Sequence, residues 1–172
     1  AKCCELDIPV VITTGPASLV PNTVIDHVAP RYIDFVARDF PELKIVVSHG
    51  GYPWVNEMIM VTQRNANVYL ELSEYEFFPQ SEAYIQAINT LISDKVVFAS
   101  AHPFVDFRVA LKNYETLQFS PEVREKIMFR NAARILKIAD CSAVEPSDGQ
   151  MERIIIESVL KELAKRGMVA GA

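Results

Sequence analysis

The feature that most constrains the fold is a set of four short apolar runs, separated by segments with helical spacing. The runs cover residues 8–14, 43–48, 68–73 and 95–100, and three of them are almost continuously apolar and rich in β-branched residues. Such runs are typical of strands that are covered on both faces. Strands that alternate with helices predict βαβ units and a parallel sheet.

Only helices are expected after the fourth run. Residues 108–117 and 131–138 carry apolar side chains at the spacing of an amphipathic helix. Between them, Ser120-Pro121 places a capping residue before a proline, which is a common way for a helix to begin.

The composition excludes several classes of protein. The chain has 172 residues, of which 50% are hydrophobic and 23% charged, so it can bury a core and is not a disordered or low-complexity protein. Its net charge is −5 and its basic residues are scattered singly, which argues against a nucleic-acid or membrane-surface partner. No apolar run approaches the roughly 18 residues of a membrane span. We therefore expect a small-molecule substrate.

The cysteines indicate the compartment. Cys3, Cys4 and Cys141 cannot all pair with one another, and none of them stands in a C-x-x-C motif. Free thiols are typical of a reducing environment, so the expected location is the cytoplasm.

Polar side chains gather where the expected strands end. In a parallel β/α sheet or barrel, reactive side chains come from the carboxyl ends of the strands and the loops that follow. Two of the three histidines, His49 and His102, fall at equivalent ends of separate strands. They either line one cleft or simply cap their strands.

His49 is the stronger candidate for a catalytic residue. It follows an apolar strand and precedes Gly50-Gly51, which leave room for a ligand to approach. An imidazole there could serve as general acid, general base or metal ligand. His102 could line the same cleft as an auxiliary group. Glu71 is a weaker candidate, because acidic residues near strand ends are more often solvated.

Five ordered phrases carry a family resemblance: IPVVITTGP, DFPELKIVVSHGGYPWVNE, NVYLELS, KVVFASAHPF and VREKIMFRNAARILKI. Together they resemble the C-terminal half of the amidohydrolase-related TIM-barrel family, which includes aminocarboxymuconate-semialdehyde decarboxylase and other metal-dependent hydrolases and nonoxidative decarboxylases. The resemblance covers about residues 1–139. It implies the last four strands of a (β/α)8 barrel, so the expected fold class is α/β, with a partial barrel over residues 1–140.

The resemblance also implies a divalent metal such as zinc, but the ligand positions have changed. The family takes ligands from an H-x-H on the first strand, a histidine on the fifth and an aspartate on the eighth. No H-x-H occurs in this chain, the fifth-strand position falls on Thr13 and the eighth on Ala101. His49 matches the sixth-strand histidine and is the only retained candidate for the metal site. Because a catalytic zinc site needs about three protein ligands, we expect the metal to be bound weakly or not at all.

Two functions from different classes remain open, and the sequence leaves undecided whether the chain is an enzyme. The first is a hydrolase or nonoxidative decarboxylase that acts on a small polar or carboxylated substrate, with His49 as acid/base and His102 as auxiliary group. The alternative is a non-catalytic half-barrel that serves as a binding or assembly module, which Thr13 and Ala101 favour.

The end of the chain and the incomplete barrel suggest partners. Residues 141–149 have the composition of a linker, and residues 150–172 carry an amphipathic helix. That helix either packs on the barrel or docks on a protein partner through residues 150–167, as the similar short helices that direct enzymes into bacterial microcompartments do. Four β/α units cannot close a barrel, so we expect a homo-oligomer or a missing N-terminal half.

Overall fold

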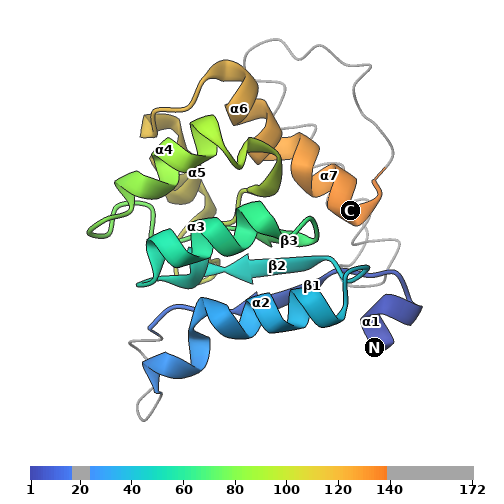
Figure 1. Ribbon diagram of the computed structural model, residues 1–172. Coiled ribbons are helices and arrows are strands. Elements are labelled where there is room, and N and C mark those ends of the chain that lie inside the picture. The colour runs from blue at the N-terminus through green and yellow to red at the C-terminus, as the bar shows by residue number, and fades with distance from the viewer. Residues whose placement is uncertain (17–23, 139–172) are drawn as a thin grey trace. The chain divides into compact units, whose positions relative to one another are not determined.

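A short parallel sheet forms the centre of the protein. The computed structural model describes residues 1–16 and 24–138, in which strands β1 (Val10–Thr13), β2 (Ile45–Ser48) and β3 (Val68–Leu70) lie side by side in that order (Figure 1). Both pairings are parallel, and Val11 aligns with Val46, which aligns with Tyr69. The carboxyl ends of the strands therefore lie along one edge of the sheet, as the sequence predicts.

Helices connect and follow the strands. The α-helices within the described residues are α1 (Lys2–Glu5), α2 (Pro30–Asp39), α3 (Val55–Arg64), α4 (Glu82–Thr90), α5 (Phe107–Thr116), α6 (Pro121–Glu125) and α7 (Asn131–Leu136). Short 3₁₀ segments form η1 (Ile25–Val28), η2 (His49–Gly51) and η3 (Ser93–Lys95), and η4 (Lys126–Arg130) is a π-helical turn. The predicted helix start is confirmed, since the Ser120 side chain accepts a hydrogen bond from the Val123 N–H and Pro121 opens α6.

The expected fourth strand is reduced to a single parallel bridge between Leu70 and Val96. The Val97 N–H still bonds to the Leu70 carbonyl, at 2.8 Å, but the next N–H, of Phe98, bonds to the Ile127 carbonyl of η4 at 2.9 Å. The Phe98 N–H faces away from β3, because successive N–H groups of a strand point to opposite edges, and within the described residues no backbone hydrogen bond continues the ladder with β3 beyond Val97. The prediction of a strand over residues 95–100 was wrong in its extent, although its parallel direction is confirmed.

The main core lies between one face of the sheet and the helices that connect the strands. Side chains that point to this face, among them Ile45 and Val47, pack with residues of α2, α3 and α4. A smaller cluster lies on the opposite face, where Val46 packs with Val97 and with Ile135 of α7. All four residues of β2 are therefore buried, as the uninterrupted apolar run predicts.

Strand β1 is the edge of the sheet and is much more open than β2. Its residues alternate between half-buried and exposed, and Val11 is 64% exposed. Val11 and Thr13 share the exposed face because alternate residues of a strand point to the same side.

One compact unit spans Ala1–Ile138. The predicted linker over residues 141–149 and the helix over 150–172 lie outside the described residues. Within the described part of the chain, no helix combines the length and the apolar character that crossing a membrane requires.

Candidate functional site

His49 stands directly after β2, in a turn with unusual backbone conformation. His49, Gly50 and Gly51 have φ values of 62°, 64° and 74°, in the left-handed region. Glycine adopts this region without strain, whereas a residue with a side chain rarely does. There is also no room for a side chain at Gly51, since a Cβ atom there would lie 2.6 Å from Cγ of Met58. The turn thus sends the chain sharply into α3 and leaves His49 at the edge of the sheet.

The loop after β3 fixes the imidazole of His49. Its Nδ1 lies 3.0 Å from the carbonyl oxygen of Ser73 and 3.3 Å from the Ser73 hydroxyl. A carbonyl oxygen only accepts hydrogen bonds, so the Nδ1 carries the hydrogen that is shared with it. In the neutral imidazole the Nε2 is then unprotonated, and it can take up a proton or bind a ligand.

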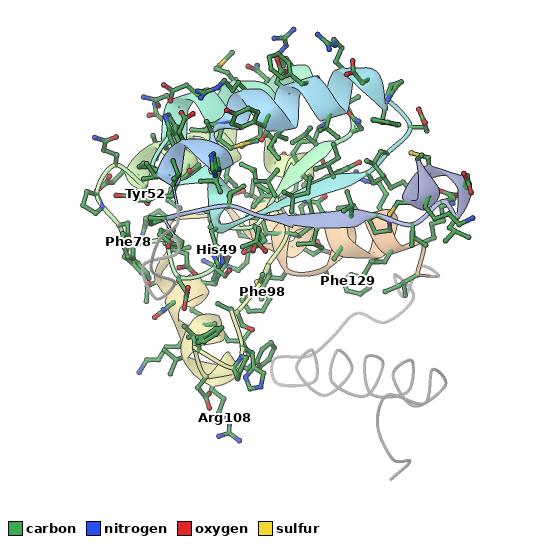
Figure 2. The ribbon with its side chains drawn as sticks, turned by 90° about the horizontal axis from the view of Figure 1, so that it is seen from below. His49, Tyr52, Phe78, Phe98, Arg108 and Phe129 are labelled. Carbon is green, nitrogen blue, oxygen red and sulfur yellow. The ribbon has the colours of Figure 1, made fainter. Side chains whose placement is uncertain are left out.

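Aromatic rings form a wall beside His49. The Tyr75 ring meets the imidazole edge to face at 5.3 Å between centroids, and it lies 5.2 Å from Tyr52 and 4.7 Å from Phe78. Figure 2 shows Tyr52 and Phe78 to one side of His49, and Arg108, which is exposed, extending away from the body of the protein. Tyr75 itself is 7% exposed, whereas Phe78 is 42% exposed and offers an apolar ring surface close to a group that can transfer protons.

Glu71 ties the ends of β2 and β3 together. Its carboxylate accepts hydrogen bonds from the Ser48 hydroxyl, from the His49 N–H at 3.1 Å and from the Ser73 N–H at 2.8 Å. The sequence analysis ranked Glu71 as a weaker candidate because acidic residues near strand ends are usually solvated. In the structure the Glu71 side chain is not solvated, since the residue is only 5% exposed. It sits at the centre of the site that holds His49.

The end of β1 joins the same site. The buried Thr14 hydroxyl donates to the Ser48 carbonyl and accepts from the Gly51 N–H at 2.9 Å. Next to it, a Cβ atom on Gly15 would lie 3.2 Å from the Cβ of His49. Three of the four expected strand ends therefore meet around His49.

Glu76 is a buried carboxyl near His49 that the sequence analysis did not single out. It is 5% exposed, and burial raises the pKa of Glu76 to about 7, with smaller contributions from the charges of Glu71 and Glu74, whereas His49 and its own backbone N–H act to lower it. A carboxyl with a pKa near neutrality can both give and take a proton at physiological pH. Only its position in the loop after β3, four residues beyond Leu72, could have drawn attention to it.

His102 is exposed and lies in the turn after the bridge residue Val96. Its backbone N–H bonds to the Ser100 hydroxyl at 3.3 Å, and Ala101 before it has a φ of 56°. No hydrogen bond joins the side chains of His102 and His49 within residues 1–16 and 24–138. A cleft shared by the two histidines stays a prediction.

The described residues around His49 do not by themselves make up a divalent-metal site. Thr13 is exposed on β1 and brings a neutral hydroxyl, and Ala101 brings no donor. Within the described residues, no three side chains of His, Cys, Asp or Glu are grouped so that they could hold a metal ion.

The chain belongs to the amidohydrolase family, because the family model described as "Amidohydrolase" matches residues 1–138. That match confirms the resemblance and covers the whole described sheet together with its helices.

Solved structures place the fold among TIM barrels. An uncharacterised TIM-barrel protein, Bb4693 from Bordetella bronchiseptica, is 36% identical with a TM-score of 0.72, and the match covers 79% of this chain and 48% of that one. A 2,6-dihydroxybenzoate decarboxylase from Rhizobium is 17% identical, with a TM-score of 0.58 over 81% of this chain and 54% of its own. 5-Carboxyvanillate decarboxylase LigW from Sphingomonas paucimobilis is 20% identical, with a TM-score of 0.57, and the match covers 79% of this chain and 51% of that one.

The chain spans about half the length of these barrels. No curated protein matches it. At these low identities the two decarboxylases support the fold and leave the substrate open.

Proposed function

We propose that this chain carries the acid–base centre of an amidohydrolase-family hydrolase or nonoxidative decarboxylase that acts on a small, planar, carboxylated substrate. The observation that carries the proposal is the hydrogen bond from Nδ1 of His49 to the Ser73 carbonyl, at 3.0 Å. It leaves Nε2 available to exchange a proton, at the carboxyl end of a parallel strand, where enzymes of this architecture place their reactive groups.

Proton transfer through Nε2 suits both reactions. In a decarboxylation the bond between the substrate carbon and its carboxyl group breaks, carbon dioxide leaves, and the electron pair left on carbon takes the Nε2 proton of the imidazolium. In a hydrolysis the neutral Nε2 instead accepts a proton from the attacking water. A positioned acid or base of this kind typically contributes about 10²–10⁴ in rate.

The aromatic wall supports a planar substrate. Tyr75 contacts the imidazole, and the partly exposed Phe78 packs on Tyr75, so a flat substrate stacked on Phe78 would lie close to His49. The decarboxylases among the structural neighbours act on aromatic carboxylates by their names, and this agrees with such a surface.

The experiment is a decarboxylation assay with the full chain. Carbon dioxide release is measured for a panel of planar carboxylates that includes 2,6-dihydroxybenzoate and 5-carboxyvanillate. We expect His49→Gln to lower the rate at least about 100-fold. His27→Gln changes an exposed histidine in η1 and should leave the rate unchanged. His102→Gln tests the auxiliary role, for which a smaller loss is expected.

A non-catalytic module is the second candidate, and the residues at the ligand positions favour it. Thr13 and Ala101 stand where the family resemblance implies a histidine and an aspartate. If no member of the panel is turned over, and His49→Gln does not alter binding of those carboxylates, the module becomes the better account. Turnover that depends on His49 would exclude it.

A further inference from the structure

We propose that Glu71 is the positioning residue of His49: by joining the ends of β2 and β3, its carboxylate selects the imidazole tautomer with hydrogen on Nδ1. The importance of this role for catalysis rests on the proposed function, in which His49 transfers protons. The effect of Glu71 on the tautomer does not depend on that function, because it concerns only the contacts of Glu71, His49 and Ser73.

The contacts of Glu71 divide between the two strand ends. Oε1 accepts from the Ser48 hydroxyl and from the His49 N–H, which belong to the end of β2. Oε2 accepts from the Ser73 N–H, which belongs to the loop after β3. A carboxylate can satisfy all three donors because both of its oxygens are acceptors. A buried ionised carboxylate needs such partners, and Glu71 is 5% exposed.

The contact with Ser73 is what reaches the imidazole. The Ser73 residue is held through its N–H, and its carbonyl faces Nδ1 of His49 at 3.0 Å. The His49 backbone is held at the same time, in a left-handed conformation with a φ of 62°. Both partners of the tautomer-selecting hydrogen bond are therefore fixed by one side chain.

The role of the side chain can be separated from that of the backbone. The Glu71 N–H bonds to the Val47 carbonyl at 3.0 Å, and the Glu71 carbonyl accepts from the Gly50 N–H at 2.8 Å. These bonds extend the parallel ladder and do not depend on the side chain. A substitution of Glu71 is therefore expected to loosen the orientation of His49 more than it loosens the sheet.

The amide of glutamine cannot replace the carboxylate. Whichever way the amide is turned, its NH₂ group faces a backbone N–H that needs an acceptor, either that of Ser73 or that of His49. Glu71→Gln therefore leaves one of the two partners of the Nδ1 hydrogen bond without its acceptor. We expect the Ser73 carbonyl to move away from Nδ1 and the two tautomers to coexist.

The test reads the imidazole nitrogens of His49 directly, by long-range ¹H–¹⁵N NMR of the full chain at about pH 9, where an ordinary imidazole is neutral. In the unmodified chain we expect one tautomer, with a protonated Nδ1 and a bare Nε2. In Glu71→Gln we expect both nitrogen shifts to move toward intermediate values. A wild-type spectrum with hydrogen on Nε2, or an unchanged spectrum in Glu71→Gln, would overturn the proposal.

Two matched variants sharpen the test. Ser73→Ala removes the hydroxyl that lies 3.3 Å from Nδ1 but keeps the carbonyl, so the tautomer should persist. Glu74→Gln removes a carboxylate that is exposed in the same loop and should also leave the tautomer unchanged. A general effect of altered charge in this loop would move the spectrum in Glu74→Gln as well, and a role for the Ser73 hydroxyl would move it in Ser73→Ala.

A second substitution protects the test against misfolding. If Glu71→Gln loses the dispersed spectrum of a folded protein, Glu71→Asp keeps the charge and shortens the side chain, so it cannot reach both strand ends. We expect the same coexistence of tautomers there, and a single Nδ1–H tautomer in Glu71→Asp would count against the proposal. The outcome is distinguishable from that of the activity assay, because the tautomer is measured whether or not a substrate is turned over.

Discussion

The carbonyl oxygen of Ser73 lies 3.0 Å from Nδ1 of His49, although 24 residues separate them in the chain. The contact exists because β2 and β3 are parallel and in register, so that their carboxyl ends meet. Site geometry therefore follows from sheet pairing: a shift of one residue between the strands would turn every side chain of one strand to the opposite face and remove the contact.

The first prediction concerns the pH dependence of stability, through Glu76. Its pKa rises from an ordinary 4.5 to about 7 in the folded chain. The folded state thus holds a proton that the unfolded state has lost between these values, and stability falls as pH rises through this window. At about 1.4 kcal/mol for each pKa unit, the loss is on the order of 3 kcal/mol.

Glu76→Gln stays uncharged at every pH and tests this. Urea unfolding is measured at pH 4.5 and pH 8. Between these values, the free energy of unfolding of the variant should rise by about 3 kcal/mol relative to that of the unmodified chain. Glu115→Gln removes an exposed carboxylate on α5, and its free energy of unfolding should depend on pH as that of the unmodified chain does. An equal pH dependence in Glu76→Gln and the unmodified chain would show that Glu76 titrates normally.

The second prediction concerns the turn after His49. A Cβ atom on Gly51 would lie 2.6 Å from Cγ and 2.9 Å from Sδ of Met58, and the φ of 74° disfavours any side chain. Gly51→Ala therefore combines overpacking with backbone strain, and we expect a loss of about 2–4 kcal/mol in urea unfolding. Adding Met58→Ala relieves only the overpacking. A double variant less stable than the sum of the two single changes would contradict this account.

Much of this fold could be predicted from local sequence patterns. The β-branched runs located three parallel strands, and Ser120-Pro121 located the start of α6, because these signals act over a few neighbouring residues. The fourth strand could not be predicted in its extent. Among the described residues its pairing with β3 stops after the bond from the Val97 N–H to Leu70, and the apolar run from 95 to 100 carries no local signal of where the pairing stops.

The candidate site was predictable only in part, for a similar reason. His49 stood out because it follows an apolar run and precedes two glycines. Glu71 and Glu76 matter because they are buried, and burial is a property of the assembled loop that alternation within a short strand does not encode. His102 had the same kind of sequence signal as His49 but is exposed, since its segment leaves the sheet after a single bridge.

The third prediction concerns the hydrogen bond that supports the glycine turn from α4. The Tyr84 hydroxyl is fully buried and donates to the Gly50 carbonyl at 2.7 Å. Tyr84→Phe leaves that carbonyl without this donor, and we expect a loss of about 1–3 kcal/mol in urea unfolding. Tyr32→Phe alters a tyrosine that is 41% exposed, and a change within about 0.5 kcal/mol is expected there. Equal losses of unfolding free energy in the two variants would show that burial of the hydrogen bond from Tyr84 adds nothing to the stability of the fold.

The last prediction compares two asparagines that make the same kind of contact in different surroundings. Asn131 is 1% exposed, and its amide donates to the carbonyls of Ser93 at 2.8 Å and Val96 at 2.7 Å. Asn89 is exposed, and its amide donates to the carbonyls of Ile85 at 3.0 Å and Gln118 at 2.8 Å. When the side chain is removed, water can replace it at Asn89, whereas the carbonyls near Asn131 stay buried without that donor.

Unfolding free energies of Asn131→Ala and Asn89→Ala therefore separate burial from the number of hydrogen bonds. We expect a loss of about 2–4 kcal/mol for Asn131→Ala and of less than about 1 kcal/mol for Asn89→Ala. Because Asn131 holds the segment around Val96, its removal should also speed amide hydrogen exchange at Val97, whose N–H bonds to Leu70. Similar losses for the two variants, with unchanged exchange at Val97, would mean that α7 does not secure this bridge to the sheet.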